Sequence, residues 1–162
     1  MKKGDYFVVL MVVAVILLVL IYEIGMPNPN AATPAAFSVN NRTYKITAYA
    51  YTQAQQEKGL MNATVTNSSF MLFYFGQPGI YSFWMKDTYS QLDIIWLNYS
   101  SSTGMAKVVY IVNATPCASY NSNQDSCIIY TPTVYADYVL ETKAGFVGQN
   151  NIMIGSSIRF LR

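Results

Sequence analysis

The sequence predicts an α+β domain, mainly β, in which a strongly curved sheet or partly closed barrel carries one or two short helices. Two observations support this fold class. Many segments after residue 37 alternate apolar and polar side chains with the period of two that is typical of strands, or form apolar runs of strand length. Helical signals are few and short, so the helices are expected to pack against a sheet that supplies most of the core.

The length of the chain favours a single folded domain. The sequence has 162 residues and shows no internal repeat. Once an apolar N-terminal segment is set aside, roughly 130 residues remain, which is enough to bury one hydrophobic core.

The strand predictions rest on alternation and on turn residues. In residues 43–51, Tyr44 and Ile46 alternate with Lys45 and Thr47, as in a half-buried strand. Turn residues such as those in Gln-Pro-Gly at 77–79 separate the apolar runs. We expect strands, in chain order, over residues 43–51, 70–75, 80–85, 92–99, 105–112, 137–142 and 157–161.

Two short helices are expected. Thr52 is an N-cap residue with Gln55 three positions later, which is the pattern of a capping box, and Gly59 ends the helix. A second short helix is expected around Ala144-Gly145-Phe146.

The N-terminus predicts a transmembrane anchor over residues 6–26. Residues 6–22 contain no charge, and as a helix they span about 26 Å, close to the ~30 Å hydrocarbon core of a bilayer. Lys2 and Lys3 precede this run and Glu23 follows it, so the positive-inside rule keeps the N-terminus in the cytoplasm.

This topology divides the chain and gives it a location. We expect a single-pass protein of the cell membrane, with the prolines after the anchor disfavouring helix and central strand. Its parts are a cytoplasmic N-terminus at 1–5, the anchor at 6–26, a Pro/Asn/Ala spacer at 27–36 and an extracytoplasmic domain at 37–162. Two alternatives stay open: a cleaved signal peptide, and a pilin-like structural subunit processed after Lys2-Lys3-Gly4.

Glycosylation and disulfide signals agree with an exported domain. Two cysteines, Cys117 and Cys127, flank a Ser/Asn-rich loop, and an oxidising exterior would let them pair. The presumed ectodomain also contains five Asn-x-Ser/Thr sequons, which predict surface glycosylation, at Asn41, Asn62, Asn67, Asn98 and Asn113.

Composition excludes several functions. The net charge is +2 without a basic stripe, so nucleic acid is not an expected partner. The chain has no histidine, which excludes Ser-His-Asp and Cys-His catalysis and His-Glu-x-x-His metal sites. A disulfide would remove the thiol nucleophiles, and we expect no metal or other cofactor.

The candidate site is an aromatic cluster beside charges in residues 81–97. Only 11% of residues are charged, so charges among these aromatics suggest either a binding site or a partly buried ion-pair network. The predicted binding patch comprises Met61, Trp84, Lys86, Asp87, Asp93, Trp96 and Glu141. Among these, Asp93, Glu141 and Lys86 are the catalytic candidates if the protein is an enzyme.

Several motifs carry a resemblance to a known family. These are Phe83-Trp84-Met85-Lys86-Asp87-Thr88 with the following Leu-Asp-Ile-Ile-Trp-Leu run, Gly59-Leu60-Met61, Met71-Leu72-Phe73, Pro116-Cys117, Val139-Leu140-Glu141 and Ala144-Gly145-Phe146. In this order they resemble the family catalogued as domain of unknown function 192, a group of small, often exported proteins without an agreed activity.

The chain also departs from that pattern. Asp87 stands where the family usually has Asn, Gln91 replaces a common Pro, and Ser156 follows Gly155 where Asp is usual. An Arg that often follows the Gly-Leu-Met motif is not evident. A shared site that depended on the missing Arg or the late Asp would be altered here.

These observations favour a membrane-anchored binding or accessory module that presents the aromatic and charged patch to an envelope glycan or a partner protein. The alternative is a carboxylate-dependent hydrolase of cell-surface glycans, in which Asp93 and Glu141 act as acid and nucleophile. A third interpretation is structural: Lys86 pairs with Asp87, Asp93 or Glu141 at the rim of the core. The sequence does not decide whether the protein is an enzyme, nor its oligomeric state.

Overall fold

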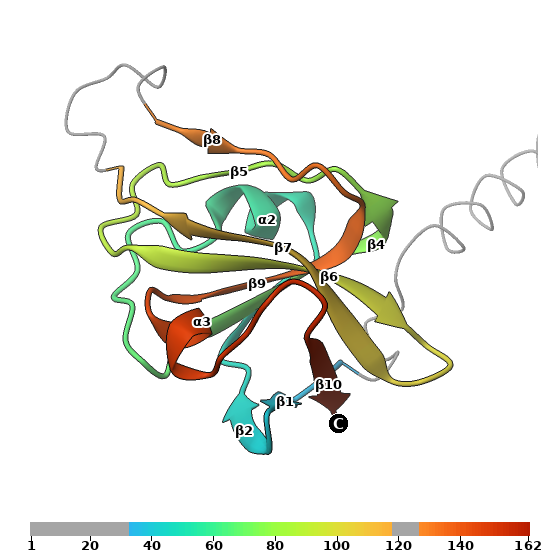
Figure 1. Ribbon diagram of the computed structural model, residues 1–162. Coiled ribbons are helices and arrows are strands. Elements are labelled where there is room, and N and C mark those ends of the chain that lie inside the picture. The colour runs from blue at the N-terminus through green and yellow to red at the C-terminus, as the bar shows by residue number, and fades with distance from the viewer. Residues whose placement is uncertain (1–32, 118–126) are drawn as a thin grey trace, which may run out of the picture. The chain divides into compact units, whose positions relative to one another are not determined.

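The computed structural model describes residues 33–117 and 127–162 (Figure 1). The predicted cytoplasmic N-terminus and anchor, the pilin-like alternative and most of the predicted spacer lie outside these residues. In the part of the chain that is described, no helix is long and apolar enough to cross a membrane. The folded unit runs from Pro34 to Arg162.

The core of this unit is one strongly curled sheet of eight strands, which agrees with the predicted mainly-β class (Figure 1). All neighbouring strands are antiparallel except the pair β3 and β4, which is parallel. In spatial order the strands are β2 (Arg42–Lys45), β1 (Ala36–Val39), β10 (Ser157–Leu161), β7 (Met105–Ala114), β6 (Leu92–Ser100), β9 (Ala136–Lys143), β4 (Phe70–Gly79) and β3 (Ala48–Ala50).

A small second sheet pairs β5 (Phe83–Trp84) with β8 (Ile129–Tyr130). Two short helices complete the unit, α2 (Gln53–Lys58) and α3 (Phe146–Gln149). Both lie where the sequence predicts them. The capping box of α2 is confirmed, because Thr52 Oγ1 accepts from Gln55 N–H while the Gln55 side chain accepts from Thr52 N–H.

Alternate side chains of the central strands build two hydrophobic clusters on opposite faces of the sheet. In β6, Ile95 and Leu97 belong to the cluster that also holds Phe146 of α3. Ile94 and Trp96 belong to the other cluster, which packs against β5. This follows from the period of two along a strand, which sends successive side chains to opposite faces.

A bulge in β7 shifts the alternation of its side chains, so that positions an even number apart across it face opposite clusters. Trp96 pairs with Tyr110 and Leu97 with Val108, so Val109 is an extra residue between them. Val108 therefore faces the same cluster as Ile95, whereas Val112 packs on the cluster of Trp96. An extra residue of this kind bends the strand and contributes to the curl of the sheet.

The structure corrects some strand boundaries. The single strand predicted over 43–51 is two strands, β2 and β3, because the chain changes partners at Ile46 and Thr47. Ile46 N–H donates to Ala35 O, while Thr47 N–H and Oγ1 both donate to Phe70 O. The strand predicted over 80–85 is reduced to β5, and neither β1 nor β8 was predicted.

The disulfide between Cys117 and Cys127 is confirmed, with 5.7 Å between the two Cα atoms. All five sequon asparagines are exposed, two of them near the ends of β6 and β7. Their exposure agrees with the expected surface positions, and glycosylation stays a prediction.

Candidate functional site

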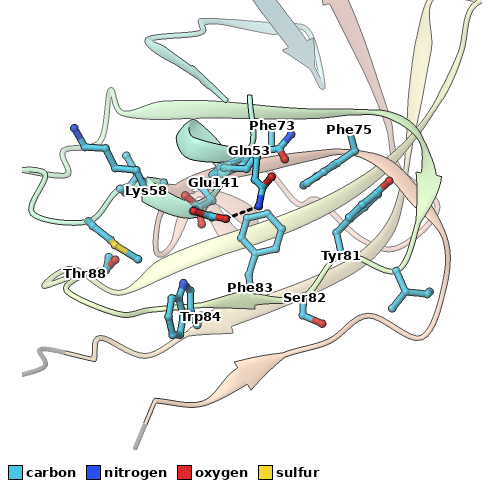
Figure 2. A pocket seen from close by; sticks show the side chains of 16 residues that line it. Gln53, Lys58, Phe73, Phe75, Tyr81, Ser82, Phe83, Trp84, Thr88 and Glu141 are labelled. Carbon is cyan, nitrogen blue, oxygen red and sulfur yellow. Dashed lines mark hydrogen bonds between the residues drawn. The ribbon is translucent and has the colours of Figure 1, made fainter. Parts of the chain in front are cut away.

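A pocket of about 360 Å³ opens on the face of the sheet that carries Trp96, between α2, β4 and β5 (Figure 2). The loop after α2 closes one side of it, because Gly59 and Leu60 line the pocket. The other lining residues are five aromatics, seven polar residues and two aliphatic ones, namely Phe73, Phe75, Tyr81, Phe83 and Trp84, then Gln53, Gln56, Glu57, Lys58, Ser82, Thr88 and Glu141, and finally Met61 and Ile80.

Glu141 is the buried acid of this pocket. It lies in β9 with Met71 of β4 and Ile94 of β6 as its cross-strand neighbours, and its side chain is only 4% exposed. Its Oε2 atom has no hydrogen-bond partner among the described residues. Burial raises the pKa of Glu141 to about 8, so the carboxyl is mostly uncharged at neutral pH.

The walls around this carboxyl are aromatic. The rings of Phe73 and Phe83 meet edge to face with centroids 4.9 Å apart, and Phe75 stacks on Tyr81 at 3.6 Å. The dashed line in Figure 2 is the hydrogen bond that Gln53 Nε2 donates to Glu57 Oε1 at 2.8 Å, beside Glu141 in the same pocket. The pocket thus combines apolar ring surface with one unpaired polar group, which is typical of small-molecule sites.

The segment that carries Tyr81 is held in place by Trp96, a buried residue of the core. The indole N–H of Trp96 donates a hydrogen bond to Tyr81 O at 2.8 Å. The Trp96 ring also meets Phe83 edge to face, with centroids 5.5 Å apart. The ring of a buried tryptophan packs against its neighbours, and its hydrogen-bonded N–H fixes the position of the acceptor. Trp96 therefore holds this wall of the pocket in place.

Trp84 forms the exposed edge of the site. Its side chain is 38% exposed, and the Lys86 ammonium lies 5.5 Å from the centroid of its ring. Trp84 lines the pocket and also an adjacent surface hollow, whose other lining residues are Ala54, Glu57, Lys58, Met61, Asn62 and Lys86. The rim therefore offers an aromatic face flanked by two lysines and one glutamate.

Gly59 ends α2 against the buried acid. Its backbone has φ +47° and ψ −134°, a conformation that side chains disfavour strongly. A Cβ at this position would lie 3.8 Å from Glu141 Oε2 and 3.5 Å from Phe73 Cζ. Glycine thus allows the chain to turn sharply beside the carboxyl.

The structure brings together four of the residues predicted as a binding patch. Glu141, Trp84, Met61 and Lys86 line the pocket or its adjacent hollow. Asp87 is not among the lining residues. It lies in a turn with φ +51°, where its carbonyl accepts from Asn62 N–H at 2.8 Å.

The structure does not bring Asp93 to this site. Asp93 pairs with Thr142 in β9, one position along from the pair of Ile94 and Glu141, so the two acids point to opposite faces of the sheet. Asp93 accepts hydrogen bonds from Val147 N–H at 2.9 Å and from Asn113 Nδ2 at 2.7 Å. Its observed contacts therefore hold the start of α3.

Two other sequence interpretations change as well. Trp96 is fully buried, so it supports the wall of the pocket and presents no surface to a ligand. Two of the predicted partners of Lys86 do not pair with it within the described residues, since Asp93 is on the other face of the sheet and Glu141 Oε2 has no hydrogen-bond partner there, while the Lys86 ammonium lies over the Trp84 ring.

Sequence reasoning missed the contribution of α2 and of Phe73. Gln53, Glu57 and Lys58 line the pocket, as does Phe73, whereas Phe83 lies within the predicted aromatic cluster. The signal was present in the motif Glu57-Lys58-Gly59-Leu60-Met61, which joins a capped helix to an unusual glycine. Among the described residues, no three His, Cys, Asp or Glu side chains come together as a metal site.

Comparison with known proteins supports the fold and identifies the family. A crystal structure of a protein of unknown function from Novosphingobium aromaticivorans is similar, with TM-score 0.60, 24% identity and coverage of 82% of this chain and 90% of that chain. A crystal structure from Sinorhizobium meliloti, provisionally described as a transcription regulator, matches with TM-score 0.61, 27% identity and coverage of 81% and 98%. Among curated proteins, none matches this sequence.

The family model for domain of unknown function 192, described as uncharacterized ACR, matches residues 36–160. This match spans both helices and, except for Leu161 at the end of β10, all ten strands of the described unit. The resemblance seen in the sequence motifs is thereby confirmed, and the chain belongs to the domain of unknown function 192 family.

Proposed function

We propose that this protein is a membrane-anchored extracytoplasmic binding module, and that its pocket takes a sugar residue of an envelope glycan. The observation that carries the proposal is the buried carboxyl of Glu141 inside an aromatic pocket, where its Oε2 has no hydrogen-bond partner among the described residues. A buried polar group without a partner costs free energy, and a ligand hydroxyl or carbonyl would satisfy it.

The rim fits the same kind of ligand. Aromatic side chains at binding sites stack on the apolar faces of sugar rings, and Trp84 combines exposure with a position at the pocket mouth. Lys58 and Glu57 stand beside it as exposed hydrogen-bonding groups. The other ligand that this pocket could take is a side chain of a partner protein, which a pull-down with the full-length chain would reveal.

The binding test uses the full-length chain in mild detergent and isolated envelope polysaccharide. Trp84→Ala should reduce retention on the polysaccharide at least about tenfold, with little change in melting temperature because the side chain is partly exposed. Tyr135→Ala is the matched control, since Tyr135 is an exposed aromatic outside the pocket lining. Equal losses for both variants, or no retention of the wild-type chain, would contradict the proposal.

The membrane topology is a separate proposal with its own test. The uncharged apolar run at residues 6–22 supports an anchor, and the disulfide agrees with an oxidising exterior. A C-terminal epitope tag should be accessible to protease in cells whose outer envelope layers have been removed and whose cell membrane is intact. Protection of the tag would contradict an extracytoplasmic domain.

A hydrolase is the second candidate, because an uncharged carboxyl near neutral pH suits a general acid. Asp93 cannot assist Glu141 from the opposite face of the sheet. The other carboxylate that lines the pocket is Glu57. Turnover of an envelope glycan that is lost in both Glu57→Gln and Glu141→Gln, with folding retained, would favour this activity over binding alone.

A further inference from the structure

We propose that the pocket is specific for the N-acetyl group of an N-acetylhexosamine residue, with the amide carbonyl on Glu141 and the methyl group among the aromatic rings. This inference rests on the proposed glycan binding and names the class of sugar.

The polar end of the pocket supplies the first argument. Glu141 Oε2 has no hydrogen-bond partner in the part of the chain that is described, and an uncharged carboxyl can donate one hydrogen bond. An amide carbonyl is a strong uncharged acceptor, and it would satisfy that donor without requiring Glu141 to ionise in apolar surroundings. The other carboxyl oxygen remains free to accept from a neighbouring sugar hydroxyl.

The charges around Glu141 argue against a cationic sugar. From α2, Glu57 and Lys58 face the pocket, and Lys86 lies beside it in the adjacent hollow. The strands on either side of Glu141 place Met71 and Ile94 next to it, and neither carries a charge. An ammonium ligand would therefore meet two lysines and would need an ionised carboxyl in an apolar setting.

The apolar end supplies the second argument. Phe73 and Phe83 line the same pocket as the carboxyl with their rings edge to face, and Gly59 leaves room beside the carboxyl where a side chain would project. An acetyl group is the simplest substituent that contacts both ends of the pocket, because its carbonyl would meet the Glu141 carboxyl and its methyl group would meet the aromatic rings. An unsubstituted hydroxyl at the same position of the sugar would leave the ring surface unused.

The mouth of the pocket fits the sugar ring that carries this group. Trp84 stands at the edge with an exposed ring, and a volume of about 360 Å³ lies in the range of roughly 300–1,000 Å³ in which small-molecule sites occur. The acetamido group would then enter first, with the ring of the sugar against Trp84.

The test compares three neutral or cationic oligosaccharides of the same β-1,4 linkage on the full-length chain in mild detergent, measured by calorimetry. These are oligomers of N-acetylglucosamine, of glucosamine and of glucose. We expect the acetylated oligomer to bind at least about tenfold more tightly than the other two at pH 6. Its affinity should fall as pH rises beyond about 8, because ionised Glu141 can no longer donate.

Two variants separate the hydrogen bond from the fold. Glu141→Gln keeps an N–H donor, so it should still bind the acetylated oligomer at pH 6 while losing the decline at high pH. Glu141→Leu should lose at least about tenfold in affinity, and its melting curve shows whether it is folded. Tyr135→Ala, outside the pocket lining, should bind as the wild type does.

The outcomes distinguish the two levels of the proposal. Equal binding of acetylated and glucose oligomers would overturn the N-acetyl inference and leave glycan binding intact. Tighter binding of the glucosamine oligomer at high pH would also overturn it, in favour of amine recognition by ionised Glu141. If the chain bound neither these oligomers nor envelope polysaccharide, both the inference and the proposed function would fail.

Discussion

Gly59 lies directly beside the buried acid Glu141: a Cβ on Gly59 would stand 3.8 Å from Glu141 Oε2. The glycine ends α2 with φ +47°, so the turn that closes the pocket depends on a backbone conformation that other residues disfavour. The conformation of Gly59 therefore produces both the chain reversal after α2 and this wall of the pocket.

Gly59→Ala should destabilise the domain by about 1–3 kcal/mol because the methyl group forces strain at this φ. Thermal unfolding followed by circular dichroism measures the effect. Gly148→Ala is the matched control, since Gly148 lies in α3 with nothing within 4 Å of its added Cβ and no positive φ. Equal melting temperatures for the two variants would contradict the role of Gly59.

The raised pKa of Glu141, about 8, predicts a pH dependence of stability. A glutamate in the unfolded chain ionises near pH 4.3, so between these two values the folded state keeps a proton that the unfolded state has released. The contribution of Glu141 to the free energy of unfolding therefore falls as pH rises from about 4 through 8, and then levels off.

Glu141→Gln should flatten this pH dependence and raise the melting temperature at pH 8 relative to the wild type. Melting curves from pH 5 to pH 9 test it. Glu57→Gln serves as the control, because Glu57 lines the same pocket but is exposed. A Glu141→Gln variant whose melting temperature follows that of the wild type at every pH would show that burial of this acid has no such consequence.

Asp93→Ala should lower stability by about 1–3 kcal/mol without affecting the pocket. The change leaves Val147 N–H and Asn113 Nδ2 without their acceptor on the face that carries α3. Unfolding in urea gives the loss of stability, and the polysaccharide retention assay gives binding. Loss of binding in a folded variant would mean that Asp93 does reach the ligand.

The two tryptophans should separate stability from binding. Trp96→Ala removes a fully buried ring with a hydrogen-bonded N–H, so it should cost about 3–5 kcal/mol. Trp84→Ala should change the melting temperature little and reduce glycan retention. Fluorescence-detected unfolding reports on both variants through the tryptophan that remains, and a reversed pattern would contradict the assigned positions.

Removing the disulfide should destabilise the domain by about 2.7 kcal/mol in the chain-entropy model. Cys117 is also linked to the pocket, because its N–H donates to Thr88 O and Thr88 lines the pocket. The double variant Cys117→Ser, Cys127→Ser should therefore melt earlier and bind more weakly. Reduction of the wild-type chain should reproduce both effects, and an unchanged melting temperature would argue against them.

The sequence by itself determined the family, the mainly-β class and the disulfide. It also located both helices and the cores of strands such as β6 and β7. Local patterns predict these features, namely the alternation along a strand, the capping box at Thr52, and the spacing of motifs and cysteines.

Only the tertiary structure decided which of the candidate residues form a site. Asp93 and Glu141 are equally acidic in sequence, but the register of β6 with β9 sends them to opposite faces of the sheet. Trp84 and Trp96 look alike in the same aromatic run, but one is partly exposed and the other is fully buried. The burial of a side chain and the face of the sheet to which it points depend on pairing between segments far apart in the chain. No local pattern specifies that pairing.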